Sequence, residues 1–146
     1  MSARDPVPTS RRDHHRARAV KTADQVKMMN GCSVLIVDDR SQAREGLKAL
    51  LATTPAVQVV GEASDGKEAI DLVEKYRPDV VLMDANMPVM DGLEATRLVK
   101  AQWPQIRVIV LTIHTALQAE ALAAGADAFL VKGCPAGELL AAILEC

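Results

Sequence analysis

Five polar residues stand directly after short apolar runs, where the strands of a buried sheet would end: Asp38, Asp39, Asp84, Thr112 and Lys132. Three carboxylates brought together repel one another, and some take up protons unless a cation neutralises them. Oxygen ligands without His or Cys suit a hard cation, Mg²⁺ or Mn²⁺. Lys132 and Thr112 could then engage the remaining oxygens of a phosphoryl group. The set is typical of an aspartate that accepts a phosphoryl group as nucleophile, and Asp84 is the expected acceptor.

The apolar runs before these residues predict the sheet that must bring them together. Each run is short, rich in β-branched residues and not alternating, as in strands that are buried on both faces. The five expected strands are Val34–Val37, Val57–Val60, Val80–Met83, Val108–Leu111 and Phe129–Val131.

Amphipathic stretches between the runs predict helices, the weakest of which covers about 116–124. Asp65 with Glu68, and Asp91 with Glu94, have the spacing of capping boxes at helix starts. The expected inward stripes are Ala43, Leu47, Leu50 and Leu51; Ala69, Leu72, Val73 and Tyr76; Ala95, Leu98, Val99 and Gln102; and Leu139, Ala142, Ile143 and Cys146.

Strands that alternate with helices predict an α/β fold with a doubly wound, five-stranded parallel sheet, order 2-1-3-4-5, as in flavodoxin-like proteins. In this order the first and third strands are neighbours at the topological switch point, beyond whose carboxyl ends ligands bind. We therefore expect Asp38, Asp39 and Asp84 to meet there, with Thr112 and Lys132 approaching from the other side.

Each of these residues also has an ordinary structural interpretation. Asp39 has N-cap spacing to Gln42, and taken alone a cap is the commoner role. Thr112 alone is most often a strand residue, and Lys132 alone is most often solvated. Asp84 is the hardest to explain structurally, because it directly ends an apolar run. The combination of residues at one edge favours the functional interpretation.

Charge divides the 146 residues into two parts. Residues 1–31 hold seven basic and three acidic residues, a net charge of +4, and few large apolar residues, so we expect a disordered basic tail. A solvated extension or an arm that touches nucleic acid or a partner are both open interpretations. Residues 32–146 carry a net charge of −6, which argues against a nucleic-acid surface on this domain.

The composition, 49% apolar and 25% charged, is that of a soluble globular protein, and no apolar run approaches the roughly 20 residues of a membrane span. The N-terminal stretch lacks the apolar segment of a secretory signal. Cys32, Cys134 and Cys146 lack zinc-ligand spacing and are odd in number. We expect neither a zinc site nor a disulfide framework, and a cytoplasmic location.

The motifs around the polar residues resemble those of response-regulator receiver domains of two-component phosphorelay systems. The matching segments, in order along the chain, are Val34–Asp39, Asp79–Gly92, Leu111–Thr112 and Gly125–Lys132. The sequence around His114 and after Lys132 most resembles that of the NarL/FixJ (LuxR-type) branch, whose members usually carry a C-terminal helix-turn-helix.

The resemblance implies that Asp84 is phosphorylated by a sensor histidine kinase, from a phosphohistidine. It implies that Asp39 and Asp84 ligate Mg²⁺ directly, together with the backbone carbonyl of Asn86. Asp38 would act on the cation mostly through water.

The resemblance also implies roles for residues around the acceptor. Thr112 and Lys132 would hold the phosphoryl group, and Phe129 would be a switch aromatic that turns inward as Thr112 moves. An ordinary core role for Phe129 is equally open. Asn86 and His114 fall where the family tunes the lifetime of the phosphoryl group, although His114 could equally be a general base or a loop residue without a role.

The expected function is a phosphotransfer switch and not an enzyme. Phosphorylation would change a protein–protein contact, with homodimerisation as a family expectation. We expect control of transcription through a C-terminal DNA-binding domain absent from this chain. A naturally stand-alone receiver that acts through a partner protein, without DNA binding, is the alternative.

Enzymes of similar fold fit the sequence less well. Aspartate-dependent phosphatases use an Asp-x-Asp pair after the first strand, whereas Asp84 and Asn86 follow the third. No GxxxxGK[ST] segment is present for a nucleotide. A flavin phosphate would be repelled by Asp38 and Asp39 after the first strand.

Overall fold

A computed structural model describes residues 31–145, so the expected tail and the side chain of Cys146 lie outside the described residues. The five strands are β1 (Cys32–Val37), β2 (Val57–Ala63), β3 (Val80–Met83), β4 (Arg107–Thr112) and β5 (Ala128–Val131). The helices are α2 (Ser41–Leu51), α3 (Gly66–Tyr76), α4 (Gly92–Gln102), α5 (Gln118–Ala123) and α6 (Ala136–Ile143), and a 3₁₀ turn, η4 (Thr115–Leu117), precedes α5. Every expected strand and helix is present, with ends that differ by a few residues.

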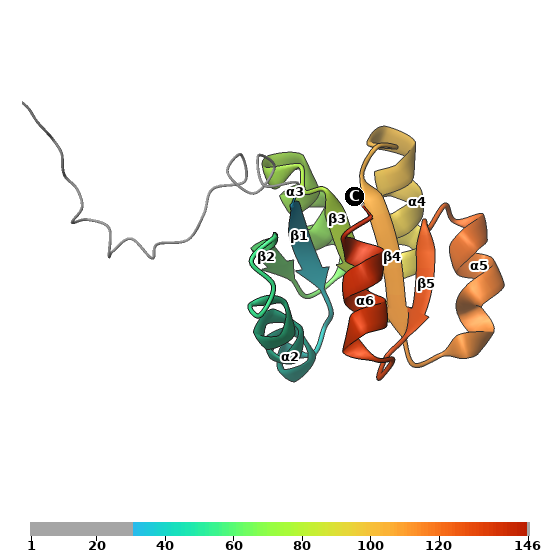
Figure 1. Cartoon of the computed structure of the whole chain (residues 1–146). Helices are drawn as coiled ribbons and strands as arrows, with labels where there is room; N and C mark the ends of the chain where they lie inside the picture. The colour runs from blue at the N-terminus through green and yellow to red at the C-terminus, as the bar shows by residue number, and fades with distance from the viewer. Residues whose placement is uncertain (1–30, 146) are drawn as a thin grey trace, which may run out of the picture.

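The strands form one parallel sheet in the order β2-β1-β3-β4-β5, which confirms the predicted flavodoxin-like topology (Figure 1). β1 pairs with β3 so that Val37 lies opposite Met83. The residue after each of these is an aspartate, so the register itself places Asp38 beside Asp84.

Helices cover both faces of this sheet (Figure 1). One apolar core lies between the sheet and α3, α4 and α5, and a second lies between the sheet and α2 and α6. The strand residues alternate between them: Leu35 and Val37 belong to the first core, and Val34 and Ile36 to the second. This division explains why β1 reads as a continuous apolar run, since both of its faces are covered.

The buried face of α4 differs from the expected stripe. Its buried residues are Gly92, Ala95, Thr96 and Val99. Leu98 is 40% exposed and Gln102 is also exposed, so both expectations are wrong. The physical reason lies at Gly92, where a Cβ atom would overlap the carbonyl oxygen of Asp84, and this close approach fixes the rotation of the helix. Tyr76 of α3, also expected in the core, is 42% exposed.

The two expected helix starts are capped. Asp65 accepts a hydrogen bond from the Glu68 N–H, and Asp91 accepts one from the Glu94 N–H, each at 2.8 Å. In a capping box, Glu68 would accept a hydrogen bond from the N–H of the N-cap residue Asp65. In α3 it accepts instead from the N–H of the preceding residue, Ser64, at 2.9 Å. These caps fix where the loops after β2 and β3 end.

Cys134 has a free thiol, whereas Cys32 is disulfide-bonded, so the sequence argument against a disulfide framework does not hold at Cys32. Within residues 31–145, every helix is too short or too polar to cross a bilayer.

Candidate functional site

The three acids predicted to meet do so at the carboxyl end of the sheet. Asp38, Asp39 and Asp84 each offer a carboxylate oxygen, and these oxygens all lie within 4.8 Å of one another. Asp38 and Asp84 are buried, with 1% and 8% of their surface exposed, while Asp39 is exposed. The arrangement is an oxygen-only cluster with one open side, which is the donor set that a hard divalent cation prefers.

Asp38 is held at every polar group. Its N–H donates to the Ala63 carbonyl at 3.0 Å. One carboxylate oxygen accepts from the Arg40 N–H at 2.9 Å, and the other accepts from Lys132 Nζ at 2.6 Å. Its carbonyl oxygen accepts from Arg44 Nη1 at 2.6 Å. Because both carboxylate oxygens already accept hydrogen bonds, the Asp38 side chain is held in place and is less available as a direct cation ligand.

Asp84 is buried but less tightly held. Lys132 Nζ lies 3.6 Å from its Oδ1, so the two form an ion pair without a hydrogen bond. Burial raises the pKa of Asp84 most, Lys132 opposes this rise, and the charges of Asp38 and Asp39 add to it. The carboxylate of Asp84 is therefore electrostatically costly in the folded protein, and a bound cation would relieve that cost.

Thr112 and Lys132 lie together because β4 and β5 are neighbours. The register pairs Thr112 with Val131, and the Lys132 N–H donates to the Thr112 carbonyl at 2.9 Å. The Thr112 side chain is fully buried, and its hydroxyl accepts from the His114 N–H at 3.2 Å. The solvated alternative for Lys132 is wrong, since its ammonium is paired with Asp38 and Asp84.

An open depression of about 290 Å³ joins these residues, and its lining is Asp39, Arg40, Asp84, Asn86, Thr112, Ile113, His114 and Lys132. Asn86 and His114, expected to flank the acceptor, are exposed at its edge. Phe129 is half-buried against the core beneath α5 and does not line the depression. Six of the eight sequence-derived site residues thus border one space. Asp38 is not in this lining but binds Lys132, which is, and Phe129 also lies outside the lining.

The cap interpretation of Asp39 is wrong. α2 begins at Ser41 after Arg40, which occupies the N-cap position without a side-chain cap. The Arg40 N–H is bonded instead by Asp38. Asp39 is left exposed at the acid cluster, where its carboxylate is free of the cap and available to a cation.

The loop that follows Asp84 is fixed at both ends. The Gly92 N–H donates to the Ala85 carbonyl at 2.8 Å, and the Met90 carbonyl accepts from the Gly66 N–H at 2.9 Å. At its apex Val89 is 80% exposed with φ of 69°, a left-handed value that β-branched residues rarely adopt. Strained residues of this kind concentrate at functional sites, where the surrounding structure holds them.

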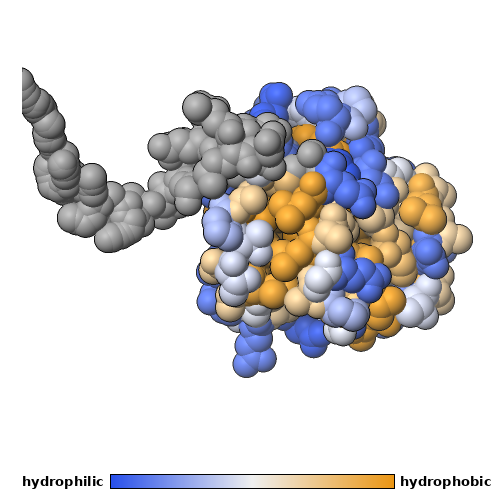
Figure 2. Space-filling model, viewed as in Figure 1, coloured by the Kyte–Doolittle hydropathy of each residue, from blue (hydrophilic) through white to orange (hydrophobic). Residues whose placement is uncertain are grey.

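A second pocket, of about 270 Å³, lies between α2 and α6 on the face shown in Figure 2, where apolar surface runs between these helices. It shares Lys132 with the polar depression, but Leu47, Leu50 and Leu139 make most of its lining apolar. It offers few groups that could hold a phosphoryl oxygen. Lys132 therefore borders both pockets, whereas Asp38 borders only the apolar one.

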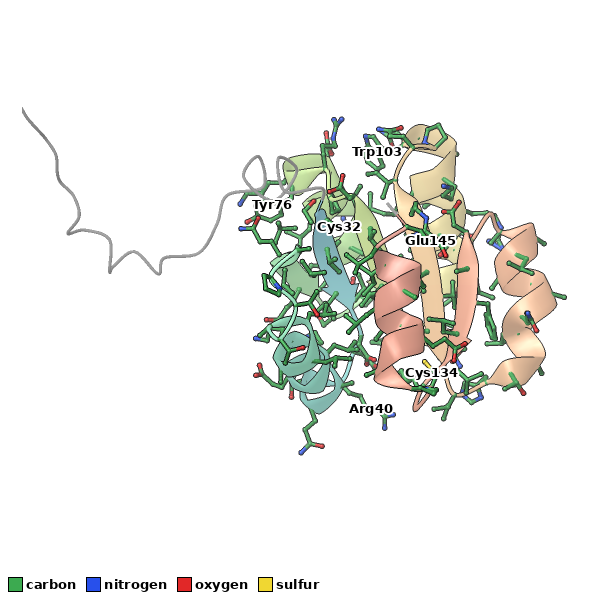
Figure 3. The ribbon with its side chains drawn as sticks, viewed as in Figure 1. Cys32, Arg40, Tyr76, Trp103, Cys134 and Glu145 are labelled. Carbon is green, nitrogen blue, oxygen red and sulfur yellow. The ribbon has the colours of Figure 1, made fainter. Side chains whose placement is uncertain are left out.

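Figure 3 shows that Arg40 and Cys134 lie at the end of the molecule toward which the strands run, while Tyr76 and Trp103 lie at the opposite end. The polar depression is at the Arg40 end. This is the end at which parallel α/β sheets bind their ligands.

Comparison with known proteins agrees with this geometry. Residues 34–144 match the family described as the response regulator receiver domain. The chain is 42% identical over 116 residues to the transcriptional regulatory protein DegU of Brevibacillus brevis, covering 78% of this chain and 49% of that protein. It is 41% identical over 113 residues to the response regulator UvrY of Escherichia coli, covering 76% and 52%.

Solved structures give the same result. The receiver domain of the response regulator NarL from Mycobacterium tuberculosis has a TM-score of 0.75 and 36% identity, covering 80% of this chain and 95% of that one. A LuxR-family two-component response regulator from Aurantimonas has a TM-score of 0.74 and 34% identity, covering 79% and 86%.

The chain belongs to the response-regulator receiver family. Its relatives are response regulators of the NarL and LuxR type, which confirms the branch predicted from the sequence. The family is one of signalling domains in regulators, not of catalytic enzymes. The chain spans about half the length of the curated relatives that it matches.

Proposed function

We propose that this domain is a phosphorylation-controlled switch in which Asp84 accepts a phosphoryl group from a sensor histidine kinase. The observation that carries the proposal is the acid cluster with Lys132 3.6 Å from Asp84 Oδ1. A carboxylate acceptor beside a cation-binding edge and a lysine combines a nucleophile with the positive charge that stabilises a transferring phosphoryl group.

The donor set fits Mg²⁺, or Mn²⁺ in its place. Asp39 is exposed and Asp84 opens into the depression, so both carboxylates can be direct ligands, and the Asn86 carbonyl would complete the protein's share. Asp38, whose carboxylate oxygens are already bonded, would act through water. Bound Mg²⁺ would supply positive charge that shields the phosphoryl oxygens from the attacking carboxylate.

The transfer follows from the positions of the protein groups. An oxygen of Asp84 attacks the phosphorus of a phosphohistidine, the P–N bond breaks, and its electron pair stays on the donor imidazole, which takes up a proton. Lys132 and the Thr112 hydroxyl would hold the phosphoryl oxygens. Asn86 and His114 at the edge of the depression would govern the access of water to the acyl phosphate.

The switch would use Thr112 and Phe129. The Thr112 hydroxyl is now engaged by the His114 N–H, and its movement toward a phosphoryl oxygen would release that bond. Phe129 is half-buried on the neighbouring strand and would fill the space that opens. The result is a population shift that changes a protein–protein contact, homodimerisation being the family's expectation.

The output that we propose is control of transcription, because relatives such as DegU are named transcriptional regulators. A related structure is described as a DNA-binding response regulator of the LuxR family. Contact with DNA would belong to a separate output domain, in keeping with the acidic charge of residues 32–146. We propose a cytoplasmic location from the family alone. The cysteines no longer indicate a reducing compartment, because Cys32 is disulfide-bonded.

The test is incubation with a small phosphodonor and Mg²⁺, followed by intact-mass analysis. We expect one added phosphoryl group in the wild type, none in Asp84→Asn, and strong suppression by a chelator. Unchanged phosphorylation of Asp84→Asn would refute the choice of acceptor.

A further inference from the structure

Arg44 of α2 reaches back to the turn that carries the acids. Its Nη1 donates to the Asp38 carbonyl at 2.6 Å, and its Nε donates to Glu62 Oε1 at 2.9 Å. Only 19% of the Arg44 side chain is exposed, and that of Glu62 is 31% exposed. The guanidinium therefore links a helix, the first loop and strand β2 through two bonds in a fixed geometry.

The carbonyl that Arg44 binds has a particular position. It belongs to the peptide group that joins Asp38 to Asp39, so its hydrogen bond fixes the plane of that peptide. The Asp38 side chain is set independently by Arg40 and Lys132. The Arg44 bond is the contact that orients the link to Asp39, whose own side chain is exposed.

Glu62 holds the guanidinium in place from the edge of the sheet. It lies opposite Ile36 in the pairing of β1 with β2. Its second carboxylate oxygen accepts from Lys48 Nζ at 2.7 Å, and Lys48 is the main cause that lowers the pKa of Glu62. Glu62 thus stays ionised near neutral pH and gives Arg44 a fixed partner.

We propose that Arg44 is a positioning residue of the cation site. By holding the Asp38–Asp39 peptide group, it orients Asp39 as a cation ligand, and Glu62 holds the Arg44 guanidinium in place. The inference rests on the proposed Mg²⁺ requirement and deepens it. Lysine cannot replace arginine here, because a single ammonium on a flexible stem cannot span both acceptors in the fixed fork of a guanidinium.

An electrostatic role and a positioning role of Arg44 predict opposite changes in cation affinity when Arg44 is replaced. Arg44 is a positive charge near a site for a positive ion. If it contributed only charge, its removal would tighten cation binding. If it presets Asp39, its removal weakens binding despite the lost repulsion.

The experiment measures Mn²⁺ affinity of the full chain by electron paramagnetic resonance of the free ion, with Mg²⁺ as competitor. We expect Arg44→Met and Arg44→Lys to raise the dissociation constant about tenfold, and Glu62→Gln about threefold, as for residues that orient metal ligands. Arg97→Met is the matched control, since Arg97 pairs with Glu94 on the exposed surface of α4. That control should leave the affinity unchanged.

Arg44→Lys keeps the charge and guards against loss of folding in Arg44→Met, and Trp103 fluorescence monitors the fold of each variant. Unchanged or tighter Mn²⁺ binding in a folded Arg44 variant overturns the inference and leaves the proposed function intact. A wild-type chain that binds no Mn²⁺ and gains no phosphoryl group overturns both. Phosphorylation of Arg44→Lys should recover at saturating Mg²⁺, and a deficit that persists there would also contradict a role in positioning the cation site.

Discussion

Lys132 Nζ and Asp84 Oδ1 lie 3.6 Å apart, close enough for an ion pair and too far for a hydrogen bond. The ammonium makes its hydrogen bond to Asp38 instead, at 2.6 Å. The lysine is thereby anchored beside the acceptor without occupying the acceptor's oxygen. An incoming phosphoryl group would meet the Lys132 ammonium already in place, while the carboxylate of Asp84 would still be free to attack.

Replacement of Lys132 by Met should slow phosphorylation of Asp84 about 100-fold, because one charged contact to the phosphoryl oxygens is lost. It should also cost about 2 kcal/mol of unfolding free energy, since Asp38 is left as a buried charge without its partner.

The double variant Asp38→Asn with Lys132→Met separates these two effects. Removal of both charges should restore most of the stability in urea unfolding, while phosphorylation stays slow. Recovery of the phosphorylation rate in the double variant would show that Lys132 acts only on stability.

The raised pKa of Asp84 predicts how stability and cation binding change with pH. A carboxyl whose folded pKa is raised destabilises the fold when ionised, so its cost is present above that pKa and is relieved as the pH falls through it. Protons and Mg²⁺ compete for the same oxygens, so Mg²⁺ affinity should begin to fall at a higher pH than for an ordinary aspartate.

Thermal unfolding between about pH 8 and about pH 5, with Mg²⁺ or with chelator, measures both effects. In chelator, Asp84→Asn should unfold a few degrees above the wild type at neutral pH, and this gain should shrink on acidification. A variant less stable than the wild type in chelator would mean that Lys132 outweighs burial at this carboxyl.

Much of this site could be predicted from the sequence, because the ends of the apolar runs mark the ends of the strands. The pairing of Val37 with Met83 places the next residues side by side, and the predicted strand order was sufficient to find Asp38 and Asp84 together. Thr112 was found by the same reasoning.

The contacts that sequence reasoning missed involve side chains that cross between elements. Arg44 and Glu62 are 18 residues apart on a helix and a strand, and no local spacing links them. Cap spacing is a local signal and favours Asp39 as a cap, whereas the hydrogen bond that the Arg40 N–H donates to Asp38 instead depends on the three-dimensional turn. Periodicity predicts Leu98 in the core, because a sequence pattern does not contain the close approach of Gly92 that fixes the rotation of α4.

Gly92→Ala should destabilise the domain by about 3 kcal/mol or more, because the added Cβ atom would overlap the backbone of Asp84. The matched control is Gly137→Ala in α6, where a Cβ atom would meet nothing within 4 Å and alanine is the better helix former, by about 1 kcal/mol. Opposite signs in urea unfolding are the expected result. A mild effect at Gly92 would show that α4 can shift away from Asp84.

Val89→Asn should stabilise the domain by about 1 kcal/mol, since asparagine tolerates a positive φ better than a β-branched residue does. The Met90 N–H bond to the Pro88 carbonyl, at 2.7 Å, holds that conformation. Val131→Asn is the control, because Val131 is also exposed but lies in β5, where valine is favoured. Destabilisation by Val89→Asn would mean that the valine side chain makes a stabilising contact.

The most direct measurement of the central claim is chemical mapping of the phosphorylated residue. Borohydride reduces an acyl phosphate to an alcohol, so a phosphorylated aspartate becomes homoserine, which peptide sequencing by mass spectrometry can locate. After treatment with a phosphodonor and Mg²⁺, we expect homoserine at position 84 and aspartate at positions 38 and 39. Homoserine at 38 or 39, or a phosphoryl group retained on His114 with position 84 unmodified, would contradict the choice of Asp84.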